Sequence, residues 1–103
     1  MKWQDLVSVL QTKLPEGRVT TYAEVSEWAY GNRTSNQPVG SLLRGASNNG
    51  YKTLTNRVVG TDGALAALPG GNQQQQEQLL AEGIPFSGNG RVNFSAITPV
   101  SLK

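Results

Sequence analysis

Two residue types that carry much of protein chemistry are missing from these 103 residues, which contain no cysteine and no histidine. Without cysteine there is no disulfide, no thiolate nucleophile and no cysteine-ligated zinc or iron–sulfur site. Without histidine as well, a transition-metal site is not expected. No nucleophile–base pair suited to acyl transfer is visible either. The sequence therefore predicts no bound metal, no cofactor and no catalytic residue.

Long apolar runs are lacking too, and charged residues are few. No segment approaches the roughly 20 apolar residues that a membrane span needs, and Lys2, Asp5 and Lys13 interrupt the N-terminal stretch where a signal peptide would be apolar. We expect a cytoplasmic monomer without membrane contact. The net charge is only +2 and the basic residues are scattered, so charge alone is weak support for a nucleic-acid partner.

The clearest local pattern is a pair of short helices in a chain of single-domain length. Thr21 and Glu24 form a capping-box pattern that predicts a helix over residues 22–30. A polar turn containing glycine, over residues 31–35, leads to a further helix that ends at Gly45. Two helices joined in this way predict a helix-turn-helix, in which the second helix is the recognition helix.

The rest of the chain predicts one α+β domain, mostly α, over residues 1–103. The other expected elements are a helix over 3–14, a polar loop over 46–53, an extended apolar segment over 65–68 and a helix over 72–81. On that last helix, the run Gln73-Gln74-Gln75-Gln76 is interpreted as a solvated face. Segments 84–86 and 91–94 flank a Ser-Gly-Asn-Gly turn and predict a small C-terminal β-hairpin, the wing of a winged helix-turn-helix. The tail from about residue 95 is expected to fray.

Several motifs, in this order and spacing, resemble the C-terminal domain of the O6-alkylguanine-DNA alkyltransferases. They are Pro15-Glu16-Gly17-Arg18-Val19-Thr20-Thr21-Tyr22 before the helix-turn-helix, Val39-Gly40-Ser41-Leu42-Leu43-Arg44 in the recognition helix, Arg57-Val58-Val59-Gly60, and the pair Gly70-Gly71. Segments 79–84 and 88–92 look most like the alkyltransferase-like proteins, the cysteine-free members of that family. The resemblance spans about Leu6 to Phe94 and implies the family's winged helix-turn-helix fold.

At the family's active site, Thr55 stands in the cysteine position and Asn56 in the histidine position. A threonine hydroxyl without a basic neighbour does not replace a thiolate, so the resemblance implies a protein that is not an enzyme. Family members bind the minor groove and rotate the damaged nucleotide into a pocket. The resemblance thus implies a partner in double-stranded DNA carrying O6-alkylguanine. It also implies nucleotide excision repair proteins as partners, to which the lesion is flagged.

The resemblance also assigns DNA contacts to particular residues. Tyr22 matches the tyrosine that helps to rotate the nucleotide's 3′ phosphate, although an aromatic packed on the core is the simpler alternative. Gly40 and Ser41 match small residues that let the helix approach the narrow minor groove, but they also suit helix packing. Arg44, at the end of the helix, suits either a phosphate or the helix C-terminus.

Two positions depart from the family pattern. Gln37 stands where the family has an intercalating arginine, and Arg33, four residues earlier, is a candidate substitute. Thr55 stands where alkyltransferase-like proteins usually carry tryptophan, which leaves a larger and more polar pocket. The implied lesion pocket consists of Tyr22, Thr55 and Val58, although Val58 also suits the core.

A remnant of the family's proton relay is expected at Asn56, Arg57 and Glu82. Asparagine keeps a hydrogen bond but does not titrate, so we expect these residues to be structural, with Arg57 bonded to loop carbonyls and to the Glu82 carboxylate.

Three hypotheses for function remain. The first is a sensor of O6-alkylguanine. The second is a general or regulatory DNA binder that does not flip bases, which the Gln37 and Thr55 departures favour. The third is a protein-interaction module on a decayed repair fold, which the weak charge favours.

Overall fold

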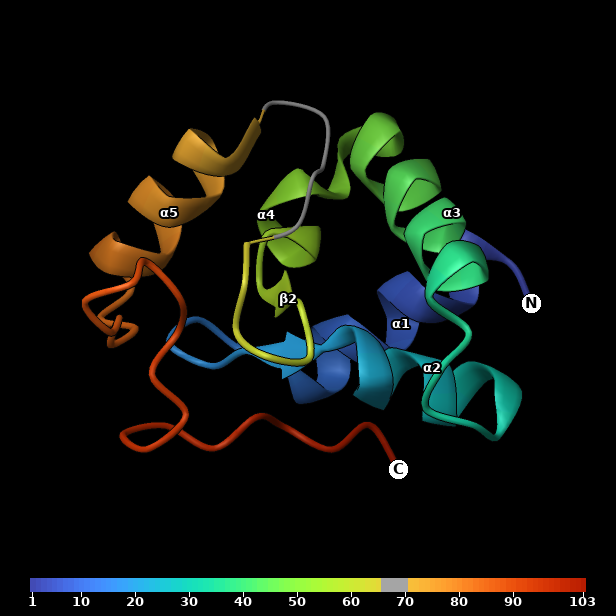
Figure 1. Ribbon diagram of the computed structural model, residues 1–103. Helices are drawn as coiled ribbons and strands as arrows, with labels where there is room; N and C mark the ends of the chain where they lie inside the picture. Colours follow the sequence, from blue (N-terminus) through green and yellow to red (C-terminus); the bar gives the residue numbers. More distant parts are fainter. Residues whose placement is uncertain (66–70) are drawn as a thin grey trace.

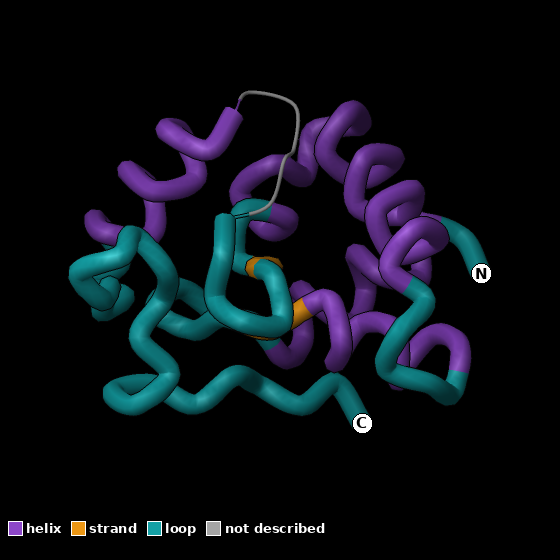
Figure 2. The backbone as a smooth tube through the Cα atoms, viewed as in Figure 1, coloured by secondary structure: helices purple, strands orange, loops and turns teal. Residues whose placement is uncertain are grey.

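The structure is a computed structural model that describes residues 1–65 and 71–103. Helices dominate it, and in Figure 1 α3 and α5 flank the short α4. The elements in order are α1 (Trp3–Lys13), β1 (Thr20–Thr21), α2 (Tyr22–Tyr30), α3 (Asn36–Ala46), the π-helical turn η1 (Ser47–Tyr51), α4 (Lys52–Thr55), β2 (Val58–Val59) and α5 (Gly71–Ala81). Figure 2 shows how little strand lies among the helices and loops. The predicted class, mostly helical with a small sheet, is confirmed.

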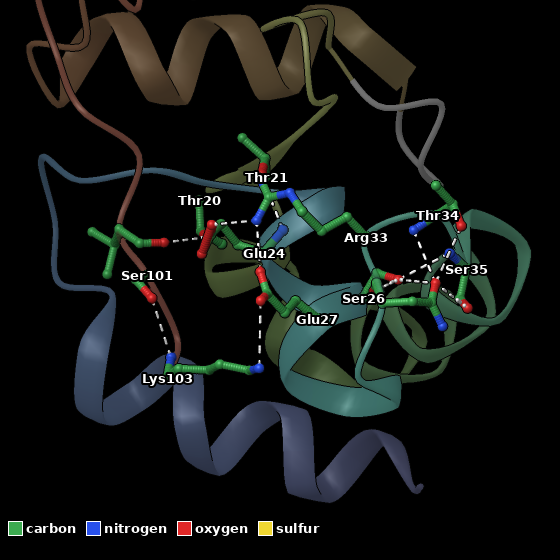
Figure 3. Close-up of polar contacts among 12 residues, drawn as sticks. Thr20, Thr21, Glu24, Ser26, Glu27, Arg33, Thr34, Ser35, Ser101 and Lys103 are labelled. Carbon is green, nitrogen blue, oxygen red and sulfur yellow. Dashed lines mark hydrogen bonds and ion pairs between the residues drawn. The ribbon is translucent and has the colours of Figure 1, made fainter.

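The helix-turn-helix forms at the predicted residues because local side chains fix both ends of α2. The Thr21 Oγ1 accepts a hydrogen bond from the Glu24 amide at 3.2 Å, which caps the first turn. Gly31 ends the helix with φ of 75°, a left-handed conformation that glycine adopts without strain. The buried Ser26 hydroxyl then donates to the Asn32 carbonyl and accepts from the Ser35 amide (Figure 3). These bonds fix the turn that leads into α3.

The main core lies between α1, α2 and α3. Its buried members are Leu6, Leu10, Leu14, Val25, Val39, Leu42, Leu43, Val58 and Leu102. A second, smaller cluster joins α5 to the C-terminal loops and contains Val19, Val59, Leu79, Ile84 and Val92. Because β2 contributes Val58 to one cluster and Val59 to the other, this two-residue strand links both parts of the domain.

The sheet is a parallel pairing of β1 with β2, in which Thr20 faces Val58 and Thr21 faces Val59. This pairing places the start of α2 beside the chain that follows α4. The predicted C-terminal hairpin is reduced to a single antiparallel bridge between Phe86 and Val92. It does not extend because Pro85 accepts from the Asn93 amide at 2.9 Å but has no N–H to return a bond to that strand.

The prediction that the C-terminal tail frays is wrong, because the tail is bonded to the body of the domain. The Val100 amide donates to the Val19 carbonyl at 2.8 Å, and the Thr20 hydroxyl donates to the Val100 carbonyl at 2.7 Å. Leu102 is only 2% exposed and belongs to the main core. In Figure 1 the red end of the chain accordingly runs along the body of the domain. The tail is ordered because it satisfies backbone groups beside β1 that would otherwise lack partners.

Two further predictions concern loops. The loop predicted over 46–53 is only partly right, because Asn49 and Gly50 have non-helical backbone angles whereas the ends of the segment belong to α3 and α4. Gly50, at φ of 96°, provides the bend between the two helices. The extended segment predicted over 65–68 falls mostly on residues 66–70, outside the described residues, as does Gly70 of the glycine pair. Leu65 packs against the smaller cluster.

Candidate nucleic-acid interface

Helix α3 presents an exposed stripe formed by Gln37, Ser41 and Arg44. Gly40 lies beside the stripe and is buried. An added Cβ on Gly40 would lie 3.2 Å from the Arg44 Nη1, so the arginine folds back along the helix over this glycine. The structure therefore brings together all four residues of α3 that the resemblance assigned to DNA contact.

A cavity of about 600 Å³ opens where the two helices of the helix-turn-helix begin. Its lining comes from Tyr22 of α2, Asn36 of α3 and the loop residues Gly60, Thr61, Asp62, Ala64 and Leu65. The β1–β2 pairing holds this loop beside Tyr22. The volume lies within the range of about 300–1,000 Å³ that is typical of ligand pockets. Except for Tyr22, none of these residues was expected from the sequence to line a pocket.

Tyr22 is half-buried at the edge of this cavity. Burial raises the pKa of its hydroxyl above the usual value, and the positive charge of Arg44 opposes this rise only in part. The side chain is therefore a neutral phenol at neutral pH, able to donate as well as accept a hydrogen bond. The same effect shows that Arg44 of α3 and Tyr22 of α2 lie close enough to interact electrostatically.

Thr55 and Val58, the other two expected pocket residues, do not share a surface with Tyr22. Both are fully buried, with no exposed area. The Thr55 hydroxyl donates to the Lys52 carbonyl at 3.2 Å, within its own helical turn. Val58 packs into the main core because it lies on β2. In this structure neither residue lines the cavity at Tyr22, and Val58 belongs to the core.

The expected ion pair between Arg57 and Glu82 forms. The arginine donates three hydrogen bonds to the two carboxylate oxygens, at 2.9–3.1 Å, and a further bond to the Leu14 carbonyl at 3.3 Å. The Gly17 amide and the Gln78 side chain also donate to Glu82. Burial by itself raises the pKa of Glu82, but these hydrogen bonds outweigh it and hold the pKa below the ordinary value.

Two glutamines of α5 bond to Asn56, and one of them, Gln78, connects it to Glu82; the sequence did not indicate either. The Gln78 side chain accepts a hydrogen bond from the Asn56 side-chain nitrogen Nδ2 at 2.9 Å and donates one to the Thr53 carbonyl at 2.8 Å. Gln75 is 1% exposed and donates to the carbonyls of Asn56 and Val58. The interpretation of the glutamine run as a solvated face is therefore wrong for Gln75. Amides, which do not titrate, occupy the path from Asn56 to Glu82.

Arg33, the candidate substitute for the missing arginine, is paired on α2. Its guanidinium contacts Glu24 at 2.9 Å and Glu27 at 2.7 Å, and Lys103 approaches Glu27 at 3.4 Å (Figure 3). These bonds draw its charge away from the exposed stripe of α3. In this structure Arg33 therefore pairs with the carboxylates of α2, and Gln37 remains without a substitute cation.

These features define a helix-turn-helix domain of the DNA-binding type. Residues 2–84 match the model of the 6-O-methylguanine DNA methyltransferase, DNA binding domain, and the chain belongs to this family. No helix within residues 1–65 and 71–103 is both long enough and apolar enough to cross a membrane. The same described residues contain no group of three or more acidic side chains placed to hold a metal ion.

Curated relatives and a solved structure agree with this membership. The DNA base-flipping proteins of Escherichia coli (strain K12) and Shigella flexneri are each 34% identical over 92 residues, covering 89% of this chain and 66% of theirs. The chain thus spans slightly less than two thirds of their length. The fold is similar to S. pombe Atl1, solved in complex with damaged DNA containing O6-carboxymethylguanine. That likeness has a TM-score of 0.66 at 21% identity and covers 93% of this chain and 95% of the other.

Proposed function

We propose that this protein binds duplex DNA containing O6-alkylguanine without repairing it. In this proposal α3 enters the minor groove and the modified nucleotide rotates into the cavity at Tyr22 and Asn36. The observation that carries the proposal is the position of that cavity. It opens at the first residue of α3, directly beside the exposed stripe of Gln37, Ser41 and Arg44. The names of the relatives, which refer to base flipping and to damaged DNA, support the same function.

The residue chemistry supports binding rather than alkyl transfer. Alkyl transfer needs a nucleophile that is exposed and activated by a base or a cation. The chain has no cysteine, and the Thr55 hydroxyl is buried and bonded to a backbone carbonyl. Binding therefore leaves the lesion chemically unchanged.

Each residue of the interface has a role in this proposal. The neutral Tyr22 hydroxyl donates to the phosphate beside the rotated nucleotide, and Arg44 supplies a positive charge to the backbone. The small Ser41 allows α3 to lie close to the groove floor, and Gly40 leaves room for the Arg44 side chain that folds over it. Gln37 fills the gap in the base stack with an amide that can bond a base edge. Unstacking a base costs a few kcal/mol and least for a damaged base, so the equilibrium favours the lesion.

The proposal extends to the setting in which the protein acts. It is a cytoplasmic monomer, and its complex with the lesion is a flag for nucleotide excision repair proteins. The family resemblance supports this part of the proposal. Pull-down of those proteins on lesion-containing DNA, with and without this protein, tests it. Recovery that does not depend on the protein would count against the flag.

Fluorescence anisotropy on one short duplex, with and without a single O6-methylguanine, tests the proposed function. Tighter binding to the modified duplex is expected, together with increased fluorescence from a base analogue placed beside the lesion. Equal binding with a steep salt dependence and no change in the analogue would instead indicate a DNA binder that does not flip bases. Absence of binding at low salt would favour a protein-interaction module.

A further inference from the structure

Helix α3 has a second cavity, of about 530 Å³, on the flank opposite the first. Residues from three elements line it, among them Lys2, Trp3 and Gln4 at the start of α1, Tyr30 at the end of α2, and Pro38 and Ser41 on α3. Successive residues of a helix are about 100° apart around its axis. Asn36 at the first cavity is therefore roughly 140–160° from Pro38 and Ser41 at the second. Gln37 and Arg44 fall between the two cavities.

This arrangement matches what a helix meets in a minor groove. The groove is only about 6 Å wide, whereas a helix with its side chains is about 10–12 Å across. A helix that reaches the groove floor with one stripe must therefore have a sugar–phosphate backbone along each flank. The exposed stripe of α3 has one cavity on each side of it, so the two strands of the duplex have separate places to run.

The second cavity differs from the first in charge. Asp62 lines the first cavity, whereas no acidic residue is among the described residues that line the second. Lys2 is exposed and its ammonium group makes no ion pair within the described part of the chain. The nearby Asp5 carboxylate accepts from the Lys2 backbone amide at 3.1 Å. The positive end of the α1 dipole also lies here, because Trp3 and Gln4 begin that helix.

We propose that the second cavity binds the sugar–phosphate backbone of the strand opposite the lesion. The inference rests on the proposed function, since it assumes that α3 enters the minor groove. Lys2 contacts a phosphate of that strand, and Gln4 and Ser41 offer hydrogen bonds to phosphate or sugar oxygens. The exposed Tyr30 and Pro38 form an apolar wall against the deoxyribose rings. Ser41 belongs both to the stripe and to this cavity, so the interface is continuous.

The inference is tested by measuring DNA binding when a protein variant and neutral phosphates in the duplex are introduced separately and together, as in a double-mutant cycle. Methylphosphonates replace neighbouring phosphates near the lesion, either on the opposite strand or on the lesion strand, in otherwise identical duplexes. Lys2→Ala is compared with wild type and with Lys13→Ala. The control removes the same charge at the other end of α1, about 16 Å away at a rise of about 1.5 Å per residue.

With unmodified phosphates, Lys2→Ala is expected to weaken binding several-fold and to lower the salt slope by about one, while Lys13→Ala binds like wild type. Neutral phosphates on the opposite strand should weaken DNA binding by the wild-type protein markedly more than binding by Lys2→Ala. Neutralising the lesion strand should weaken both proteins equally. The inference is overturned if Lys2→Ala binds DNA like wild type, or if neutral phosphates on the opposite strand weaken its binding as much as they weaken wild type. Either result would leave the proposed function standing. Wild-type protein that binds no duplex overturns it together with the proposed function.

Discussion

Replacing Glu82 by alanine is expected to destabilise the domain by about 3–5 kcal/mol, because it leaves the buried charge of Arg57 without its partner. The two side chains are only 5% and 11% exposed, respectively, so water does not replace the lost contacts. Three hydrogen bonds from Arg57 disappear, and only the bond to the Leu14 carbonyl remains. The amide of Gly17 loses its acceptor as well.

This loss of unfolding free energy in Glu82→Ala is large for a domain of this size. Total stabilities are typically about 5–15 kcal/mol, so the change removes a substantial part of the free energy of unfolding. At about 4–8 °C per kcal/mol for a small domain, Tm falls by roughly 12 °C or more. Urea unfolding followed by circular dichroism at 222 nm measures the change. Arg33→Ala is the matched control, since it removes an exposed arginine from two ion pairs and should have little effect.

The pH dependence gives a second readout of the same carboxylate. The pKa of Glu82 is below 4.5 in the folded state, so the unfolded chain binds more protons than the folded one near that pH. The contribution of Glu82 is therefore fully present well above pH 4.5 and is lost as the pH falls through the folded pKa. The stability difference between wild type and Glu82→Gln should narrow in that range. A Glu82→Ala cost under about 1 kcal/mol, or one matched by Arg33→Ala, would refute the reasoning.

Three other expectations follow from the described contacts. Arg44→Ala and Tyr22→Ala should each weaken DNA binding in anisotropy titrations, with a lower salt slope for the arginine variant; unchanged binding in both would count heavily against α3 as the docking element. Gly63→Ala should destabilise by at least about 1–3 kcal/mol in urea unfolding, because φ is +87° and the new Cβ would lie 2.6 Å from the Val92 carbonyl oxygen; wild-type stability would contradict this account. Leu102→Ala should cost about 2–5 kcal/mol, whereas a fraying tail would make it neutral.

The helix-turn-helix could be predicted because its signals are local. The Thr21 cap and the terminal Gly31 both act within one or two turns of the helix that they bound, and the structure uses both. The apolar positions of α3 likewise repeat at helical spacing, which buries Leu43 and leaves Gln37 exposed. Residues on one face of a helix follow from spacing alone, so the stripe could be described before the fold was known.

The structural features that the sequence did not predict depend on contacts between segments that are distant along the chain. A two-residue parallel strand is too short to show any period, so the pairing of β1 with β2 has no local signature. Gln75 looks like its neighbours in composition, but it is buried because two backbone carbonyls beside β2 accept from its amide. The lining of the first cavity was missed for the same reason, since only the β1–β2 pairing brings Gly60 and Thr61 to Tyr22.

The packing of α1 against α3 has a practical consequence. Trp3 lies against Gly45, where an added Cβ would approach the indole to 2.9 Å, and its ring centroid is 6.0 Å from that of Tyr51. The indole therefore sits beside the recognition helix at Gly45, on the flank where the second cavity opens. With Trp28 replaced by phenylalanine, the remaining tryptophan emission comes from Trp3, where α1 meets α3 and the second cavity. The domain thus carries an intrinsic probe through which movement of this helix on DNA can be followed without a dye.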